Sequence, residues 1–278
     1  MTRLAAILVT LAASFVMPAA AAAATHTENA RLGQVTARLT FDESSQGELS
    51  NLRLTIFRGP AALLDYAVPG PCSGPCPALP GGGGQRRSIE VRELNSDAEP
   101  EVILDVNTGG AHCCDWAYVY GYVPAQNRYA LTERDFGNQG YRLMRLGRGR
   151  PVGFLGSDDR FAYAFTDYAD SEFPPEIFRF AGGSFVDETR SHPSTIRRDA
   201  RRLLREYRRQ RGHRDVRGVL AAYAADQYLL GRGPAGLRTV RKALRRRDVR
   251  RLEFSGWPRG GSYLRALRKS LRAWGYIR

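Results

Sequence analysis

The spacing of hydrophobic residues divides the chain into two parts. In the first part, apolar and polar residues alternate over short stretches separated by turn residues, which is typical of half-buried antiparallel strands. From Ser194 onward, apolar residues recur at the spacing of amphipathic helices. We therefore predict an α+β protein, with an antiparallel β-rich domain over residues 25–193 followed by a small, basic α-helical region over residues 194–278.

The alternating stretches also predict where the strands lie. In chain order these are residues 35–41, 52–57, 61–68, 89–91, 102–106, 117–123, 128–133, 141–146, 151–155, 176–180 and 184–186. Four helices follow, and Ser194 and Asp215 are suited to cap the first two. Ile196, Leu203 and Tyr207 lie on the apolar face of the first helix, so the helices are expected to cover a sheet or to form a small bundle.

Residues 1–24 have the order of a secretory signal. Arg3 precedes an apolar run that ends at Met17, and Pro18 and a string of alanines follow. The apolar run is shorter than the ~20 residues that span a bilayer. We predict cleavage after Ala24 and a secreted, extracellular protein that is not an integral membrane protein.

The four cysteines favour disulfides over free thiols in an exported chain. Cys72 and Cys76 lie in a loop rich in proline and glycine, and Cys113 and Cys114 are adjacent. The sequence leaves the connectivity open: either Cys72 joins Cys76 and the adjacent pair forms a vicinal bridge, or both loop cysteines join the adjacent pair. A zinc or thiol site at His112 is less consistent, because adjacent cysteines rarely bind one tetrahedral ion.

One acidic segment has the spacing of a metal-binding loop. It connects two predicted strands and carries oxygen-bearing side chains at alternate positions: Glu93, Asn95, Asp97 and Glu101, with the Glu99 carbonyl between them. Several oxygens directed at one point suit a hard divalent ion, so we predict Ca²⁺ as the cofactor. The alternative is an acidic turn without an ion. Ala98 stands where such loops use glycine at positive φ, at a cost of roughly 1 kcal/mol.

The same segment resembles the calcium loop of FG-GAP or VCBS repeats in integrin-type β-propellers, D-x-D-x-D-G-x-x-D/E. Residues 78–195 also resemble a group of secreted bacterial proteins of unassigned activity, in which such a loop precedes a strand and the string TGGAHCC, here residues 108–114. The resemblance implies a propeller-blade-like or sandwich-like β domain with degenerate repeats, and it implies no catalytic residues. A second copy of the unit at residues 141–155 would have lost every ligand side chain.

Basic charge is concentrated in the predicted helices. Residues 194–278 hold 25 Lys and Arg against 6 Asp and Glu, a net charge of +19; because the whole chain carries +14, residues 1–193 carry −5. Arginines recur one helical turn apart at Arg197, Arg201, Arg205 and Arg209, where like charges repel. Acidic residues of the β domain, counterions or an anionic partner must offset them. Because 40 of the 42 basic residues are arginine, a coding bias is a further explanation.

Two classes of function follow from these features. The first is a secreted, non-enzymatic binding or structural module with a calcium-type loop and a polyanion-attracting helical region, whose partners are anionic cell-wall polymers, polysaccharides or lipid headgroups. The alternative is an extracellular hydrolase that uses aspartates between residues 158 and 170. The absence of G-x-S-x-G, H-E-x-x-H and P-loop strings favours the first class. Secretion argues against a specific nucleic-acid partner.

Overall fold

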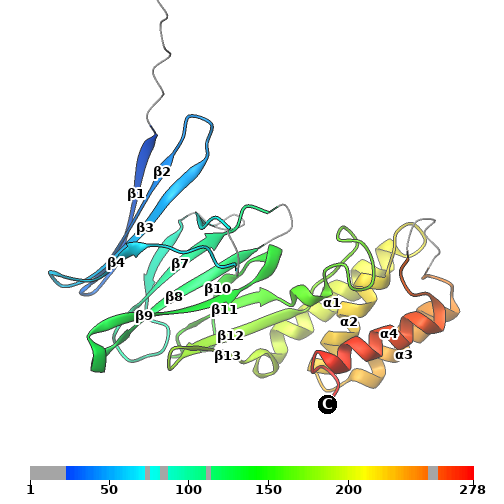
Figure 1. Cartoon of the computed structure of the whole chain (residues 1–278). Helices are drawn as coiled ribbons and strands as arrows, with labels where there is room; N and C mark the ends of the chain where they lie inside the picture. The colour runs from blue at the N-terminus through cyan, green and yellow to red at the C-terminus, as the bar shows by residue number, and fades with distance from the viewer. Residues whose placement is uncertain (1–22, 73–75, 82–86, 111–113, 250–255) are drawn as a thin grey trace, which may run out of the picture.

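The computed structural model describes residues 23–72, 76–81, 87–110, 114–249 and 256–278, and these form an antiparallel β part followed by four helices (Figure 1). The predicted α+β class is therefore confirmed. The strands are β1 Ala24–Leu32, β2 Val35–Glu43, β3 Leu49–Arg58, β4 Ala61–Ala67, β5 Leu79–Pro80, β6 Ile89–Arg92, β7 Glu101–Asn107, β8 Asp115–Val123, β9 Arg128–Asp135, β10 Arg142–Arg145, β11 Val152–Ser157, β12 Pro175–Ala181 and β13 Ser184–Asp187. The helices are α1 Pro193–Gln210, α2 Arg217–Leu229, α3 Gly233–Arg245 and α4 Gly260–Ala273.

The strands form three antiparallel sheets, each built from strands that are consecutive in the chain. Their orders are β1-β2-β3-β4, β5-β7-β8-β9 with β6 paired to β7, and β10-β11-β12-β13. Every strand predicted from the alternation is present. Strand β1 was not predicted, because it is a mostly exposed edge strand with polar residues such as His26 and Glu28 instead of an apolar stripe. Residues 1–22 of the predicted signal lie outside the described residues.

The middle sheet has hydrophobic side chains on both faces. Leu104 and Tyr118 pack with Leu39 and other residues of the first sheet. From the opposite face, Ile103 and Val119 pack with phenylalanines of the third sheet. The three sheets therefore stack as layers around two hydrophobic cores, and strand β7 is buried along most of its length because it lacks a solvent-facing side.

The helices have a third core of their own. Leu203 and Tyr207 of α1 pack with residues of α2, α3 and α4, and two aromatic residues from the segment after β11, Phe161 and Phe165, join them. Helix α1 begins at Pro193 and has His192 as its N-cap, so the prediction that Ser194 caps it is wrong. Proline suits the first helical position, where its missing N–H is not needed, and this starts the helix before the serine.

Asp215 is not the N-cap of α2 either, since Val216 occupies that position. Its carboxylate instead accepts a hydrogen bond from the backbone N–H of Arg217 at 3.0 Å. The same carboxylate forms an ion pair with the Arg217 guanidinium, and both side chains are 0% exposed. Thr166 donates a further hydrogen bond to Asp215 at 2.7 Å. The aspartate thus serves the start of the helix and also neutralises a buried arginine.

One arginine joins the end of the β part to the ends of two helices. The guanidinium of Arg190, which follows β13, donates to the carbonyl oxygens of Tyr228 and Leu229 at 3.1 and 3.5 Å, where α2 ends. It also donates to the carbonyls of Gly275 and Tyr276 at 3.3 and 3.2 Å, just after α4. The Arg190 guanidinium thus adds donors at the ends of both helices, where backbone carbonyls run out of intrahelical partners and a cation is favoured. None of the helices in the described residues has the length and hydropathy of a membrane-spanning segment.

Candidate functional site

The predicted calcium loop connects strands β6 and β7, which pair in antiparallel register from Ile89↔Leu104 to Arg92↔Glu101. At its centre the side-chain amide of Asn95 donates to Asp97 at 2.8 Å and to Glu101 at 2.7 Å. The second oxygen of Glu101 accepts from the backbone N–H of Leu94 at 2.8 Å. The fold therefore brings three of the predicted ligand side chains together around one amide nitrogen.

The other two predicted ligand residues use their side chains differently. One oxygen of Glu93 accepts from the backbone N–H groups of Asn95 and Ser96 at 3.0 and 2.6 Å, which folds the loop tightly. The Glu99 carboxylate forms a two-point ion pair with Arg58 of β3, at 2.9 and 3.0 Å. Glu99 therefore ties the loop to the first sheet, and only its backbone carbonyl is left to serve as the predicted ligand.

Glu101 is the buried member of the cluster, with 1% of its surface exposed. The pKa of its carboxyl group is raised to about 7, mainly by burial and in smaller part by the nearby charges of Glu93 and Asp97, while the Leu94 N–H acts in the opposite direction. The cause is physical: a desolvated carboxylate beside two others lacks a cation to compensate its charge. Among the described residues, the group that donates to both Glu101 and Asp97 is the neutral amide of Asn95.

The backbone of the loop follows the expected shape. Ala98 adopts a positive φ of 67°, at the position where the calcium loops that this segment resembles carry glycine, and Ser96 has a φ of 68°. Within the described residues, no group of three or more His, Cys, Asp or Glu side chains is arranged to hold a metal ion. The carboxylate oxygens of Asp97 and Glu101, which one amide nitrogen bridges, suit Ca²⁺, whereas the amide oxygen of Asn95 accepts from the backbone N–H of Asp97.

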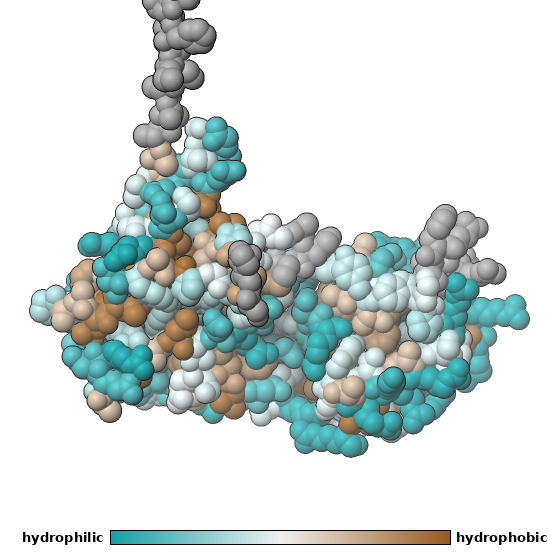
Figure 2. All heavy atoms as spheres, viewed as in Figure 1, coloured by the Kyte–Doolittle hydropathy of each residue, from teal (hydrophilic) through white to brown (hydrophobic). Residues whose placement is uncertain are grey.

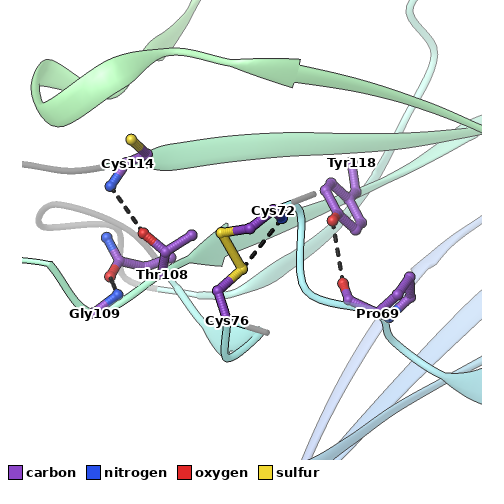
Figure 3. Close-up of a disulfide and its surroundings, with 8 residues drawn as sticks. Pro69, Cys72, Cys76, Thr108, Gly109, Cys114 and Tyr118 are labelled. Atoms are coloured by element: carbon purple, nitrogen blue, oxygen red, sulfur yellow. Dashed lines mark hydrogen bonds between the residues drawn. A yellow bond between two sulfur atoms is a disulfide. The ribbon is translucent and has the colours of Figure 1, made fainter. Parts of the chain in front are cut away.

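Cys72 and Cys76 form a disulfide, with their Cα atoms 5.9 Å apart (Figure 3). This is one of the connectivities that the sequence left open, and it excludes joining both loop cysteines to the adjacent pair. His112 and Cys113 lie outside the described residues. The backbone N–H of Cys114 donates to Thr108 at 3.3 Å. No free cysteine occurs in the part of the chain that the structure describes.

Three of the four aspartates between residues 158 and 170 are engaged in contacts that hold the fold, whereas one carboxylate oxygen of Asp159 is buried without a partner among the described residues. Asp158 is buried and accepts hydrogen bonds from Arg160 and from the hydroxyl of Tyr276, both at 2.7 Å. Asp170 pairs with Arg214 at 2.5 Å. Asp167 accepts from the backbone N–H of Asp170 at 2.9 Å. These partners link the β part to the helices, and they give the carboxylates a structural use.

The predicted arginine face lies on α1 and points into solvent. Arg197, Arg201, Arg205 and Arg209 are exposed. Arg209 pairs with Glu206 at 2.7 Å, whereas the ion pairs among the described residues include none to the other three. In Figure 2 hydrophilic residues cover the lower and outer edges of the helices, and hydrophobic patches are visible over the sheets.

Other arginines of the helical region do contact the acidic β part. Arg202 pairs with Glu172 at 2.8 Å and with Asp199 of its own helix at 2.7 Å, and Arg214 pairs with Asp170. The explanation that arginines offset their charge on the β part thus holds for Arg202 and Arg214. It does not hold for Arg197 and Arg201, which have neither contact in the described structure.

A protein-family model matches the helical region that includes this face. Residues 196–275 match the sll0997 C-terminal domain family. A probable thylakoid lumen protein of Synechocystis sp., sll0997, is 28% identical over 167 residues, which cover 55% of this chain and 47% of the relative. An uncharacterized protein of Sinorhizobium fredii, y4bJ, is 30% identical over 155 residues, which cover 53% of this chain and 24% of the relative.

The chain thus spans less than half the length of either of these curated relatives. No solved structure gives a significant match. The matched family segment covers α1 from Ile196 through α4, so it includes the arginine face but neither the calcium-type loop nor the disulfide.

Proposed function

We propose that the chain is a non-enzymatic, extracytoplasmic binding module that attracts polyanions through the arginine face of α1 and that is steadied by Ca²⁺ in the 93–101 loop. The observation that carries the proposal is the group of exposed arginines Arg197, Arg201 and Arg205, which have no ion-pair partner among the described residues. Repulsion between charges one turn apart is relieved when a polyanion binds across them. Anionic cell-wall polymers, polysaccharides and lipid headgroups share this chemistry.

An extracytoplasmic location is supported by three observations. The first 24 residues have the order of an export signal. Cys72 and Cys76 form a disulfide, which persists in oxidising compartments. One relative is named as a probable thylakoid lumen protein. Secretion to the outside of the cell is the narrower form of this proposal.

The calcium part of the proposal rests on the carboxylates of the loop, which lie close together without a cation beside them in the described structure. Ca²⁺ would supply the positive charge that Asp97 and Glu101 lack, with Glu93, Asn95 and the Glu99 carbonyl as the remaining oxygen donors. The likeness to FG-GAP or VCBS loops is retained as part of this proposal. The structural contacts of Asp158 and Asp170 favour a binding role over hydrolysis.

Binding to immobilised heparin as a function of salt tests the arginine face. The wild-type protein should be retained at low salt and released as salt rises, because the Debye length falls to ~8 Å at physiological ionic strength. Arg197→Gln with Arg201→Gln should weaken retention more than Arg241→Gln with Arg245→Gln. The second pair removes the same charge at the same spacing from exposed positions on α3.

Three outcomes are informative. A greater loss for the α1 pair supports the face, and an equal loss for both pairs shows that only net charge matters. A wild-type protein that ignores heparin even at low salt contradicts the proposal and leaves coding bias as the explanation for the arginines.

A further inference from the structure

A groove of about 530 Å³ lies between the third sheet and α1. Its walls come from distant parts of the chain: the segment before β10, strand β11 and the start of β12 on one side, and α1 on the other. The volume falls in the range of small-ligand sites, roughly 300–1,000 Å³.

Four arginines line this groove, and they differ in their partners. Arg202 is held between Asp199 and Glu172, so its charge is compensated and its position is fixed. The ion pairs of the described residues include none to Arg142, Arg198 or Arg205. One of these three comes from β10 and two come from α1, so uncompensated guanidinium groups reach the groove from both of its walls.

The acidic residue of the groove does not cancel this charge. Asp199 is occupied by Arg202, and behind it lies Asp226 of α2, which is fully buried. Burial, and then the neighbouring Asp199 carboxylate, raise the pKa of Asp226 well above its ordinary value. Asp199 is therefore engaged within its own helix, and the buried Asp226 carboxyl group lies out of reach of a ligand in the groove.

The other residues that line the groove suit a small organic molecule. Phe173, Leu155 and Pro175 provide apolar surface, while Thr195 and Ser157 provide hydroxyl groups. Such a mixture of apolar walls and a few polar groups is typical of sites that bind small molecules or the end of a glycan chain. Arginine forks recognise the planar oxygens of carboxylates and phosphates in two-point hydrogen bonds.

We infer that this groove binds an acidic sugar or sugar chain end, through a carboxylate or phosphate group held by Arg142, Arg198 and Arg205. The inference rests on the proposed function and deepens it, because it gives the polyanion a discrete attachment point. The outer arginines Arg197 and Arg201 would attract the polymer by charge alone, whereas the groove would select one oxyanion.

Calorimetric titration with short ligands tests the groove. The probes are galacturonate trimer, glucose 6-phosphate and, as a neutral control, glucose. Arg142→Gln with Arg198→Gln should weaken binding of the acidic probes roughly tenfold or more, because charged hydrogen bonds are lost. Arg197→Gln with Arg201→Gln removes the same charge outside the groove and should change it by less than about twofold, since exposed charges are screened.

The acidic probe that binds identifies the oxyanion as a carboxylate or a phosphate. Arg198→Lys keeps the charge but loses the two-point hydrogen bonding of the guanidinium group, so its loss of affinity should be smaller than that of the double glutamine variant. If both double variants weaken binding equally, the inference that the groove binds the oxyanion is wrong. It is also wrong if the protein binds heparin but none of the short probes. In both cases the proposed function still stands. If neither heparin nor the probes bind, both fail. Circular dichroism melting confirms that each variant is folded.

Discussion

The acidic loop and the arginine face of α1 are both clusters of like charge, but the fold buries part of the first and exposes the second to solvent. In the loop, Glu101 is 1% exposed and its carboxylate has only neutral donors beside it. On α1, Arg197 and Arg201 are exposed to water and to counterions. Burial makes uncompensated charge costly, whereas solvation makes it nearly free. The loop should therefore affect stability, and the helix face should affect binding.

The largest effect is expected where an arginine of the helical region is buried. Asp215→Asn leaves the Arg217 guanidinium at 0% exposure without its carboxylate, and breaking a buried pair in this way costs about 3–5 kcal/mol. Urea unfolding measures the loss. Asp215→Asn combined with Arg217→Met should recover part of it, because no buried charge then remains. A loss below about 1 kcal/mol for the single variant would show that water reaches Arg217.

Calcium should have the next largest effect, through the loop. At a calcium concentration 100 times its Kd, binding to the folded state alone adds about 2.7 kcal/mol to the free energy of unfolding. The melting temperature should rise accordingly in the wild type and stay unchanged in Asp97→Ala. Glu99→Gln is the matched control: it breaks the ion pair with Arg58 but keeps the backbone carbonyl, so its calcium shift should persist. A wild type that is insensitive to calcium rules out the site.

Stability should also depend on pH through Glu101, and calcium should remove this dependence. Burial raises the folded-state pKa of Glu101 to about 7 from 4.5, so the folded protein holds this proton more tightly than the unfolded chain does. The contribution is therefore favourable below about pH 4.5 and is lost as pH rises to about 7. Glu101→Gln should flatten the fall in stability over this window when calcium is absent. Saturating calcium should stabilise the ionised form and remove the fall in the wild type.

A second carboxyl group contributes to the same pH window. Burial raises the pKa of Asp105 to about 7, although the hydroxyl of Tyr141 donates to it and opposes the rise. Part of the fall should thus remain in Glu101→Gln and disappear when Asp105→Asn is added. Thermal melting of the single and double variants between pH 4.5 and 7 separates the two residues. An unchanged slope in Glu101→Gln would mean that this carboxyl group is hydrated in solution.

The smallest effect is expected on the exposed helix face. Arg197→Gln with Arg201→Gln should leave the free energy of unfolding within about 0.5 kcal/mol of the wild type, or raise it slightly as repulsion is relieved. Urea unfolding of this pair beside Asp215→Asn compares exposed and buried charge in one helical region. A clear drop in stability would mean that these arginines dock on the β part.

Much of the fold could be predicted from local patterns. The period-two alternation located every strand except β1 and the two-residue β5, because half-buried strands repeat an apolar face. Strand β1 pairs at the edge of its sheet through backbone hydrogen bonds, so its side chains are largely exposed and carry no stripe. Helix faces were likewise visible, and Ile196, Leu203 and Tyr207 are buried as expected.

The two candidate sites differ in whether local sequence patterns could predict them. The acidic segment 93–101 is nine residues long and connects two paired strands, so the spacing of its side chains alone placed Asn95, Asp97 and Glu101 together. The groove was not predicted, because Arg142 and Arg198 are 56 positions apart and only the packing of α1 beside the third sheet brings them to one cavity. A local signal existed in Arg198, Arg202 and Arg205, which share one side of the arginine-rich helix, but no local pattern indicated which strands would face them.

The guanidinium of Arg190 has a consequence for how the helical region is joined to what precedes it. Its acceptors are the backbone carbonyls of Tyr228, Leu229, Gly275 and Tyr276, which exist whatever side chains those positions carry. The donor lies outside the matched segment 196–275, whereas three of the four acceptors lie within it. This contact therefore tolerates changes of side chain at the helix ends, whereas the pairs of Arg202 with Glu172 and of Arg214 with Asp170 depend on the side chains at both positions.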